Sequence, residues 1–211
     1  MKKLNLILLL LTGMASIPYA QSVKIGTQVW MTKNLDVSTF RNGDPIPQVK
    51  SNEEWIKAWQ NFKPAWCYYD NDRTNGMKYG KLYNWHAIID SRGLAPVGYH
   101  IPSDAEWTKL IDYLGGKDVA GTKMKSKNGW ECGWEFEGNG TNTSGFLGLP
   151  GGGRSEDGSF GFDTHTFGMW WSSSEANPGS GWSCSLNAIE GCVGWYPSYK
   201  GKGFSVRCLK D

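Results

Sequence analysis

The chain has 211 residues, with 22 basic and 20 acidic side chains. Its 12 Trp, 9 Tyr and 28 Gly residues indicate a compact domain with large aromatic side chains and many turns. The balance of charge argues against a nucleic-acid partner, because nucleic-acid-binding proteins neutralise phosphates with excess Lys and Arg.

The N-terminus has the pattern of an export signal. Lys2 and Lys3 precede a short apolar run, and Ala20 provides a small residue for cleavage. The run is shorter than the roughly 20 residues that span a bilayer. We therefore predict a signal peptide over residues 1–20 and a mature chain that begins at Gln21. Removal of this segment takes away the two lysines and leaves 20 basic against 20 acidic residues. We expect no further transmembrane segment in the mature chain. The expected location is outside the cytoplasm, whether secreted, at the cell surface or in the periplasm.

Two capping boxes predict the two main helices. In each box a serine hydroxyl accepts the N–H of the third residue, and a glutamate there reaches back. Ser51 and Glu54 form the first box, ahead of apolar residues at helical spacing: Trp55, Ile56, Trp59 and Phe62. Pro64 ends this helix. Ser103 and Glu106 form the second box, ahead of a second apolar stripe: Trp107, Leu110, Ile111 and Leu114. A shorter third helix is expected over residues 119–125.

The remaining segments are typical of strands and loops. Residues 23–31 alternate between apolar and polar and predict a strand or hairpin. Beyond Asn128 the helical pattern ends, and glycines divide the chain into short strand-like runs. Helices in the first half and strands in the second indicate an α+β class. We expect a single domain over residues 21–211.

Four motifs occur in order along the mature chain. They occupy residues 97–107 (VGYHIPSDAEW), 149–154 (LPGGGR), 168–175 (GMWWSSSE) and 203–208 (GFSVRC). In these motifs the chain resembles the Fibrobacter succinogenes major paralogous domain family, from about Val23 to Asp211. More distantly it is similar to the C-type-lectin-like fold of formylglycine-generating enzymes and phage receptor-binding variable proteins. The resemblance implies two main helices packed on small antiparallel sheets, with long loops.

The same resemblance implies a ligand-binding surface near the C-terminus. In receptor-binding relatives the ligand meets residues between the Trp-Trp-Ser-Ser motif and the last strand. The matching positions here are Asn177, Trp182, Asn187, Trp195, Tyr196 and Tyr199. Rigid aromatics among Ser, Gly and Asn are typical of versatile binding surfaces. The alternative is core packing, which we expect for Trp170 and Trp171. If Trp195 and Tyr196 share a strand, they face opposite ways and one points outward.

We therefore expect a non-enzymatic domain that binds a glycan or a protein through this aromatic face. The first alternative is a structural or surface-assembly component without a ligand. The second is a copper-dependent enzyme of the formylglycine-generating type, which uses two cysteines late in the chain. Cys184 and Cys192 are late, but the residues around them do not match that active-site pattern.

Five cysteines in an exported chain predict disulfides. A hairpin centred near Ala188 would place Cys184 opposite Cys192. The resemblance implies a second pair, Cys67 with Cys208, because the two ends of this type of fold meet in one sheet. Cys132 would then be free. The alternative is that some or all of the cysteines are reduced and buried.

No local metal motif is present in the sequence. His86, His100 and His165 have no histidine partner at the spacing of a metal site. Asp70 and Asp72 begin a run with oxygen donors at alternating positions, as in calcium loops, but Lys81 occupies the position of the bidentate glutamate. We prefer an Asx-rich turn here, with calcium as the alternative, and expect no other cofactor.

Overall fold

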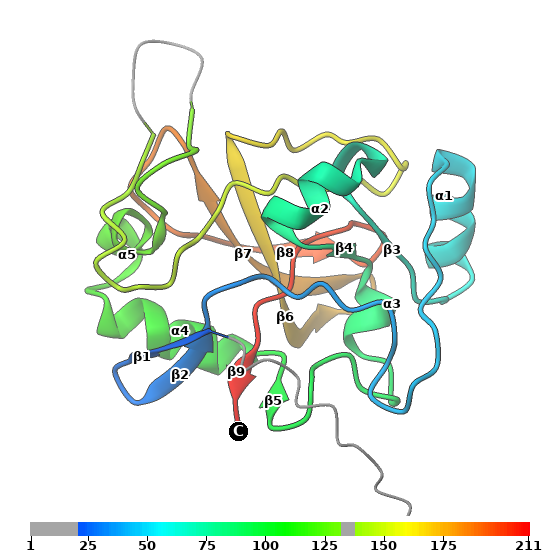
Figure 1. Ribbon diagram of the computed structural model, residues 1–211, viewed down its shortest axis with the longest axis horizontal. Coiled ribbons are helices and arrows are strands. Elements are labelled where there is room, and N and C mark those ends of the chain that lie inside the picture. Colours follow the sequence, from blue (N-terminus) through cyan, green and yellow to red (C-terminus); the bar gives the residue numbers. More distant parts are fainter. Residues whose placement is uncertain (1–20, 132–137) are drawn as a thin grey trace, which may run out of the picture.

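The computed structural model describes residues 21–131 and 138–211 (Figure 1). The predicted signal peptide and Cys132 therefore lie outside the described residues. Within the described ranges, no helix is long and apolar enough to cross a membrane.

The described helices all lie before the C-terminal strands. They are α1 (Asn52–Gln60), the 3-10 helix η1 (Tyr69–Asn71), α2 (Arg73–Tyr79), α3 (Trp85–Ile88), α4 (Asp104–Tyr113) and α5 (Lys117–Met124). Both predicted capping boxes are formed, at the starts of α1 and α4. The third predicted helix is α5. One boundary differs: α1 ends at Gln60, and Phe62 lies beyond it in a left-handed conformation with a φ of 56°.

Two short helices, α2 and α3, are absent from the sequence-based prediction. The Asp72 side chain accepts the Thr74 N–H and caps α2, and the Asn84 side chain accepts the Ala87 N–H and caps α3. Asp and Asn are also typical of turns, and helices this short have too few residues for an apolar period. The segment predicted as an Asx turn is therefore η1 followed by the first turn of α2.

The strands of the described residues form three small antiparallel sheets. The first has the order β1 (Ser22–Ile25), β2 (Gln28–Met31), β9 (Leu209–Lys210), β5 (Tyr99–His100). The second pairs β3 (Trp66–Cys67) with β4 (Leu82–Tyr83), and the third has the order β6 (Phe167–Asn177), β7 (Ser180–Asn187), β8 (Gly194–Tyr199). The hairpin predicted over residues 23–31 is β1–β2. The last strand lies beside this first hairpin, so the two ends of the described chain meet in one sheet (Figure 1).

The β6–β7–β8 sheet separates two clusters of buried side chains. Trp170 and Trp171 are consecutive in β6, so they point to opposite faces. Trp170 joins the cluster that contains Trp107 of α4, whereas Trp171 packs edge-to-face on Trp85 of α3, with 5.2 Å between ring centroids. Both tryptophans are fully buried, which confirms their predicted place in the core. A third cluster surrounds Trp55 under α1.

A buried arginine fixes the position of α1. The Arg154 guanidinium is fully buried and donates to the carbonyl oxygens of Val49, Lys50 and Ser51, which lead into α1. It also donates to the carbonyl oxygen of Gly158 at 2.8 Å. Arg154 therefore ties the start of α1 to the turn that contains residues 155–158.

The predicted α+β class is confirmed, with several helices on small antiparallel sheets.

Candidate functional site

The six predicted ligand residues lie on the β6–β7–β8 sheet but do not share one face. Asn177 ends β6, Trp182 and Asn187 belong to β7, and the remaining three belong to β8. In the β7–β8 register, Cys184 pairs with Trp195, and Ser183 pairs with Tyr196. Because side chains alternate along a strand, these two pairs point to opposite faces.

Trp182 and Trp195 form a stacked pair across β7 and β8. Their ring centroids are 6.0 Å apart, with an interplanar angle of 12°. The Trp195 indole donates a 2.7 Å hydrogen bond to the Asp104 carboxylate, and its ring lies 6.2 Å from that of Trp107. The pair is half-buried against α4 and contributes to packing on that side of the sheet.

Tyr196 and Tyr199 are the exposed aromatics of the predicted set. Their exposed fractions are 56% and 62%. The outward position of Tyr196 beside the inward Trp195 confirms the predicted alternation. The two asparagines hold turns, because Asn187 accepts the N–H groups of Ile189 and Glu190, and Asn177 accepts that of Gly179.

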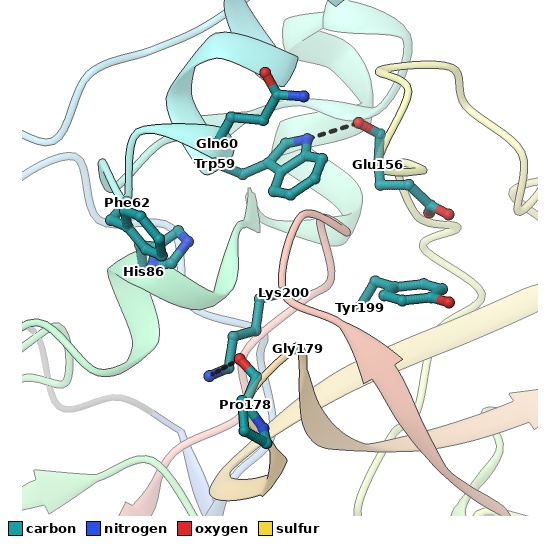
Figure 2. A pocket seen from close by; sticks show the side chains of 9 residues that line it. All are labelled: Trp59, Gln60, Phe62, His86, Glu156, Pro178, Gly179, Tyr199 and Lys200. Carbon is teal, nitrogen blue, oxygen red and sulfur yellow. Dashed lines mark hydrogen bonds between the residues drawn. The ribbon is translucent and has the colours of Figure 1, made fainter.

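Tyr199 is the one predicted ligand residue that lines the aromatic cavity shown in Figure 2. This cavity has a volume of about 420 Å³ and lies between α1, α3 and the turn that joins β6 to β7. Its walls are formed by Trp59, Gln60, Phe62, His86, Glu156, Pro178, Gly179, Tyr199 and Lys200. We take the aromatic cavity, defined by these nine residues, as the candidate site.

Contacts between distant segments hold Trp59 in the wall of the aromatic cavity. Its indole nitrogen donates a 2.8 Å hydrogen bond to the carbonyl oxygen of Glu156. Its ring lies against the backbone of Gly201, where an added Cβ would be only 2.6 Å from a ring atom. Glycine is therefore required at position 201, since a side chain would displace the Trp59 ring.

Phe62 and His86 form the side of the aromatic cavity that lies across from Glu156 and Tyr199 (Figure 2). Their rings meet edge-to-face with centroids 5.4 Å apart, and Phe62 is 78% exposed. Burial lowers the pKa of His86, a hydrogen bond with the backbone of Trp59 opposes this shift, and the charge of Lys200 adds to it. His86 is therefore neutral at pH 7, and one of its ring nitrogens can donate a hydrogen bond while the other can accept one.

Sequence reasoning missed most of the aromatic cavity. Trp59 and Phe62 read as one apolar stripe of a helix, and His86 reads as an isolated residue. One usable signal is Pro64, because a helix usually ends at or before the residue that precedes a proline, and this places Phe62 near the end of the predicted helix. No local signal links Trp59 to Tyr199, which lies 140 positions later in the chain.

The two predicted disulfides are not formed. Cys67, Cys184, Cys192 and Cys208 are all free thiols. Cys67 lies in the cluster around Trp55, whereas Cys208 lies in the cluster around Trp171, so the two side chains occupy different cores. Cys184 points into the core beside Trp170, while the Cys192 thiol donates to the Glu190 carboxylate at the surface. The alternative of reduced, buried cysteines describes Cys67, Cys184 and Cys208.

Asp70 and Asp72 do not assemble a cation site with a third acidic ligand. Among the described residues, no group of three or more His, Cys, Asp or Glu side chains is arranged to hold a metal ion. The Asp72 carboxylate caps α2 instead. Burial and the nearby Asp163 and Asp72 raise the pKa of Asp70.

His100 bridges two carboxylates at the end of the chain. Its Nδ1 lies 2.7 Å from Asp211, and its Nε2 lies 2.8 Å from Glu106. Burial lowers the pKa of His100, but the hydrogen bonds with Asp211 and Glu106 outweigh this effect, and the pKa is raised overall. The imidazole thereby connects β5, α4 and the C-terminal residue.

Comparison with known families identifies the chain. The model of the Fibrobacter succinogenes major domain matches residues 23–210, so the chain belongs to this family. This match confirms the family that the four sequence motifs indicate. No curated protein and no solved structure matches the chain.

Proposed function

We propose that the chain is an exported, non-enzymatic binding domain that holds a glycan in its aromatic cavity. The observation that carries this proposal is the presence of Trp59, Phe62 and Tyr199 on the walls of one cavity of about 420 Å³. Ligand sites of this kind are concave, mostly apolar and supplied with a few polar groups, and they range from about 300 to 1,000 Å³.

The chemistry of the aromatic cavity fits a sugar. Aromatic faces pack on the C–H faces of sugar rings and lose little conformational entropy on binding. Sugar hydroxyls need partners at the edge of the ring, and Gln60, His86 and Glu156 offer donors and acceptors there. A ligand that buries exposed Phe62 and Tyr199 also removes apolar surface from water.

The structural-component alternative would need these aromatics to be core residues. Trp182 and Trp195 fit that description in part, since they stack half-buried against α4. Phe62 and Tyr199 do not, because their rings face solvent. Exposed aromatic side chains in a cavity support the binding proposal over the structural one.

The thiols give little support to a copper-dependent enzyme. Burial raises the pKa of Cys184 far above its ordinary value, and Cys192 lies at the surface beside Glu190. A metal-binding thiol must lose its proton and share a site with its partner.

We also infer a C-type-lectin-like fold. The pairing of β9 with β2, which joins the two ends of the described chain, supports it.

The test is a glycan array with the chain that begins at Gln21, followed by titration calorimetry on the glycans that bind. Tyr199→Ala should weaken binding by about 1–3 kcal/mol, as for an interface anchor. It should leave stability nearly unchanged, because the Tyr199 side chain is 62% exposed and its loss leaves no void.

Tyr196→Ala is the matched control. Tyr196 has the same side chain, lies in the same strand and is 56% exposed, but it does not line the aromatic cavity. Equal losses in both variants would show that the cavity is not the site. If the domain binds proteins but no glycan, the ligand of the aromatic cavity is a protein and not a sugar.

A further inference from the structure

The electrostatic character of the aromatic cavity follows from how its charged groups are paired. The Lys200 ammonium donates to Glu175 at 2.7 Å and to the carbonyl oxygen of Pro178 at 2.9 Å, so its charge is neutralised within the protein. Figure 2 shows the hydrogen bond that holds this ammonium to Pro178. His86 is uncharged at neutral pH, because burial lowers its pKa.

Glu156 carries the one uncompensated charge among the residues that line the aromatic cavity. No ion pair between described residues includes its carboxylate. Its backbone oxygen is held by Trp59, and Figure 2 shows its carboxylate on the same side of the cavity as the Tyr199 ring. Glu156 as a whole is half-buried, and a carboxylate beside aromatic rings attracts a cation and repels an anion.

The aromatic walls of the cavity act in the same direction as Glu156. The faces of Trp59 and Tyr199 are electron-rich and favour cations. The end of α1 adds little, because the carbonyl oxygens of Lys57, Ala58 and Trp59 each accept a backbone N–H. The Glu156 carboxylate and the aromatic faces therefore both favour a positively charged ligand.

We infer that the aromatic cavity recognises an amino sugar with a free ammonium group, and that Glu156 is the specificity-determining residue that receives this charge. This inference rests on the proposed glycan-binding function of the same cavity. The sugar ring packs on Tyr199 or Trp59, while its ammonium group lies toward the Glu156 carboxylate. Acidic sugars are rejected, because their carboxylates would lie near an unneutralised negative charge.

The experiment compares two probes that share one sugar backbone and differ in the group on the nitrogen. A glucosamine tetramer carries free ammonium groups, whereas the N-acetylglucosamine tetramer has the same backbone with neutral amides. We expect the first to bind about 5- to 30-fold more tightly at low salt, with the difference shrinking as salt is added. Glu156→Gln should abolish this preference, because it weakens binding of the glucosamine tetramer more than binding of the neutral tetramer.

Asp157→Asn is the matched control, because it removes a carboxylate one residue away. Asp157 accepts hydrogen bonds from Ser159 and does not line the aromatic cavity. The inference holds if Asp157→Asn keeps the preference for the free amine. It is overturned if both variants lose that preference equally, or if the two tetramers bind alike to the unaltered protein.

The remaining outcomes separate this inference from the proposed function. If Tyr199→Ala weakens both tetramers but Glu156→Gln changes neither, glycan binding stands and the amino-sugar preference is wrong. If neither tetramer binds but other sugars bind in a manner that depends on Tyr199, the amino-sugar inference is overturned and the proposed glycan binding stands. A lysine-rich peptide that competes as well as the glucosamine tetramer shows that any amine suffices, which overturns the sugar preference.

Discussion

The indole nitrogen of Trp55 donates a 2.8 Å hydrogen bond to the carbonyl oxygen of Gly201, a residue that lies 146 positions later in the chain. The bond is fully buried and joins α1 to the turn after β8. The backbone of Gly201 also supports the Trp59 ring in the aromatic cavity. The Trp55–Gly201 bond therefore stabilises the fold and the site together.

Trp55→Phe should destabilise the protein more than its loss of volume alone would. Phenylalanine keeps most of the apolar contact but leaves the Gly201 carbonyl oxygen buried without its partner. An unsatisfied buried polar group costs about 1–3 kcal/mol. Urea unfolding followed by circular dichroism measures the free energy of unfolding of the variant.

Trp107→Phe is the control for this prediction. Trp107 is equally buried, yet its indole nitrogen has no hydrogen-bond partner among the described residues. The substitution therefore removes volume without breaking a hydrogen bond, and should cost about 1–3 kcal/mol less than Trp55→Phe. Equal losses would contradict a stabilising role for the Trp55–Gly201 bond. Trp107→Ala, which empties the site, should cost about 3–5 kcal/mol.

Gly181→Ala should damage the packing between β7 and α3. A Cβ at position 181 would lie 2.1 Å from the Trp85 ring, which is itself fixed against Trp171. Overpacking of this kind costs about 1–3 kcal/mol. Gly179→Ala, two residues away in the same hairpin, is the control, because its Cβ would meet its nearest neighbour at 3.7 Å. Thermal unfolding should show a lower midpoint for Gly181→Ala than for Gly179→Ala.

The sequence predicts the parts of the fold that depend on neighbouring residues. The capping boxes at Ser51 and Ser103 are complete within four residues, so the starts of α1 and α4 could be predicted. The alternation of Trp195 and Tyr196 follows from strand geometry in the same way. The caps of α2 and α3 were missed, because Asp and Asn begin turns and helices alike.

The aromatic cavity depends on contacts that a local pattern does not contain. Trp59 reaches its position through Glu156 and Gly201, and Tyr199 approaches from the end of β8. Only tertiary packing brings these segments together. The prediction of a Cys67–Cys208 disulfide fails for the same reason, because the sequence does not show which core each of these cysteines enters. Cys67 and Cys208 lie in separate clusters.

Thiol labelling should distinguish the surface cysteine from the buried ones. Burial raises the pKa of Cys67 and of Cys208 to about 12, and raises that of Cys184 further. The hydrogen bond to Glu190, followed by burial, raises the pKa of Cys192, but this thiol is partly exposed. Among the four cysteines that the structure describes, iodoacetamide at neutral pH should therefore modify Cys192 first and the other three only in denaturant, as peptide mapping measures.

Glu190→Gln should speed the labelling of Cys192, because it removes the carboxylate that disfavours the thiolate. Protection of the three buried thiols should not change. Early labelling of Cys67 or Cys208 in the native protein would contradict their burial. A disulfide between any two of these four cysteines in exported protein would contradict the free thiols.

The two histidines His86 and His100 should make the free energy of unfolding depend on pH with opposite signs. Burial lowers the pKa of His86 in the folded state, so the unfolded chain takes up this proton first. The contribution of His86 to the free energy of unfolding is therefore present at high pH and is lost as pH falls through its ordinary pKa of about 6.5.

His100 behaves in the reverse sense, since hydrogen bonds to Asp211 and Glu106 overcome burial and raise its folded-state pKa. Its contribution is complete below pH about 6.5 and is lost as pH rises through the folded-state value. Urea unfolding at pH 5.5 and pH 8 measures both effects. His86→Asn should reduce the stability lost between pH 8 and pH 5.5, whereas His100→Asn should cost more stability at pH 5.5 than at pH 8. If each variant changes the free energy of unfolding by the same amount at pH 5.5 and at pH 8, neither histidine changes its pKa on folding.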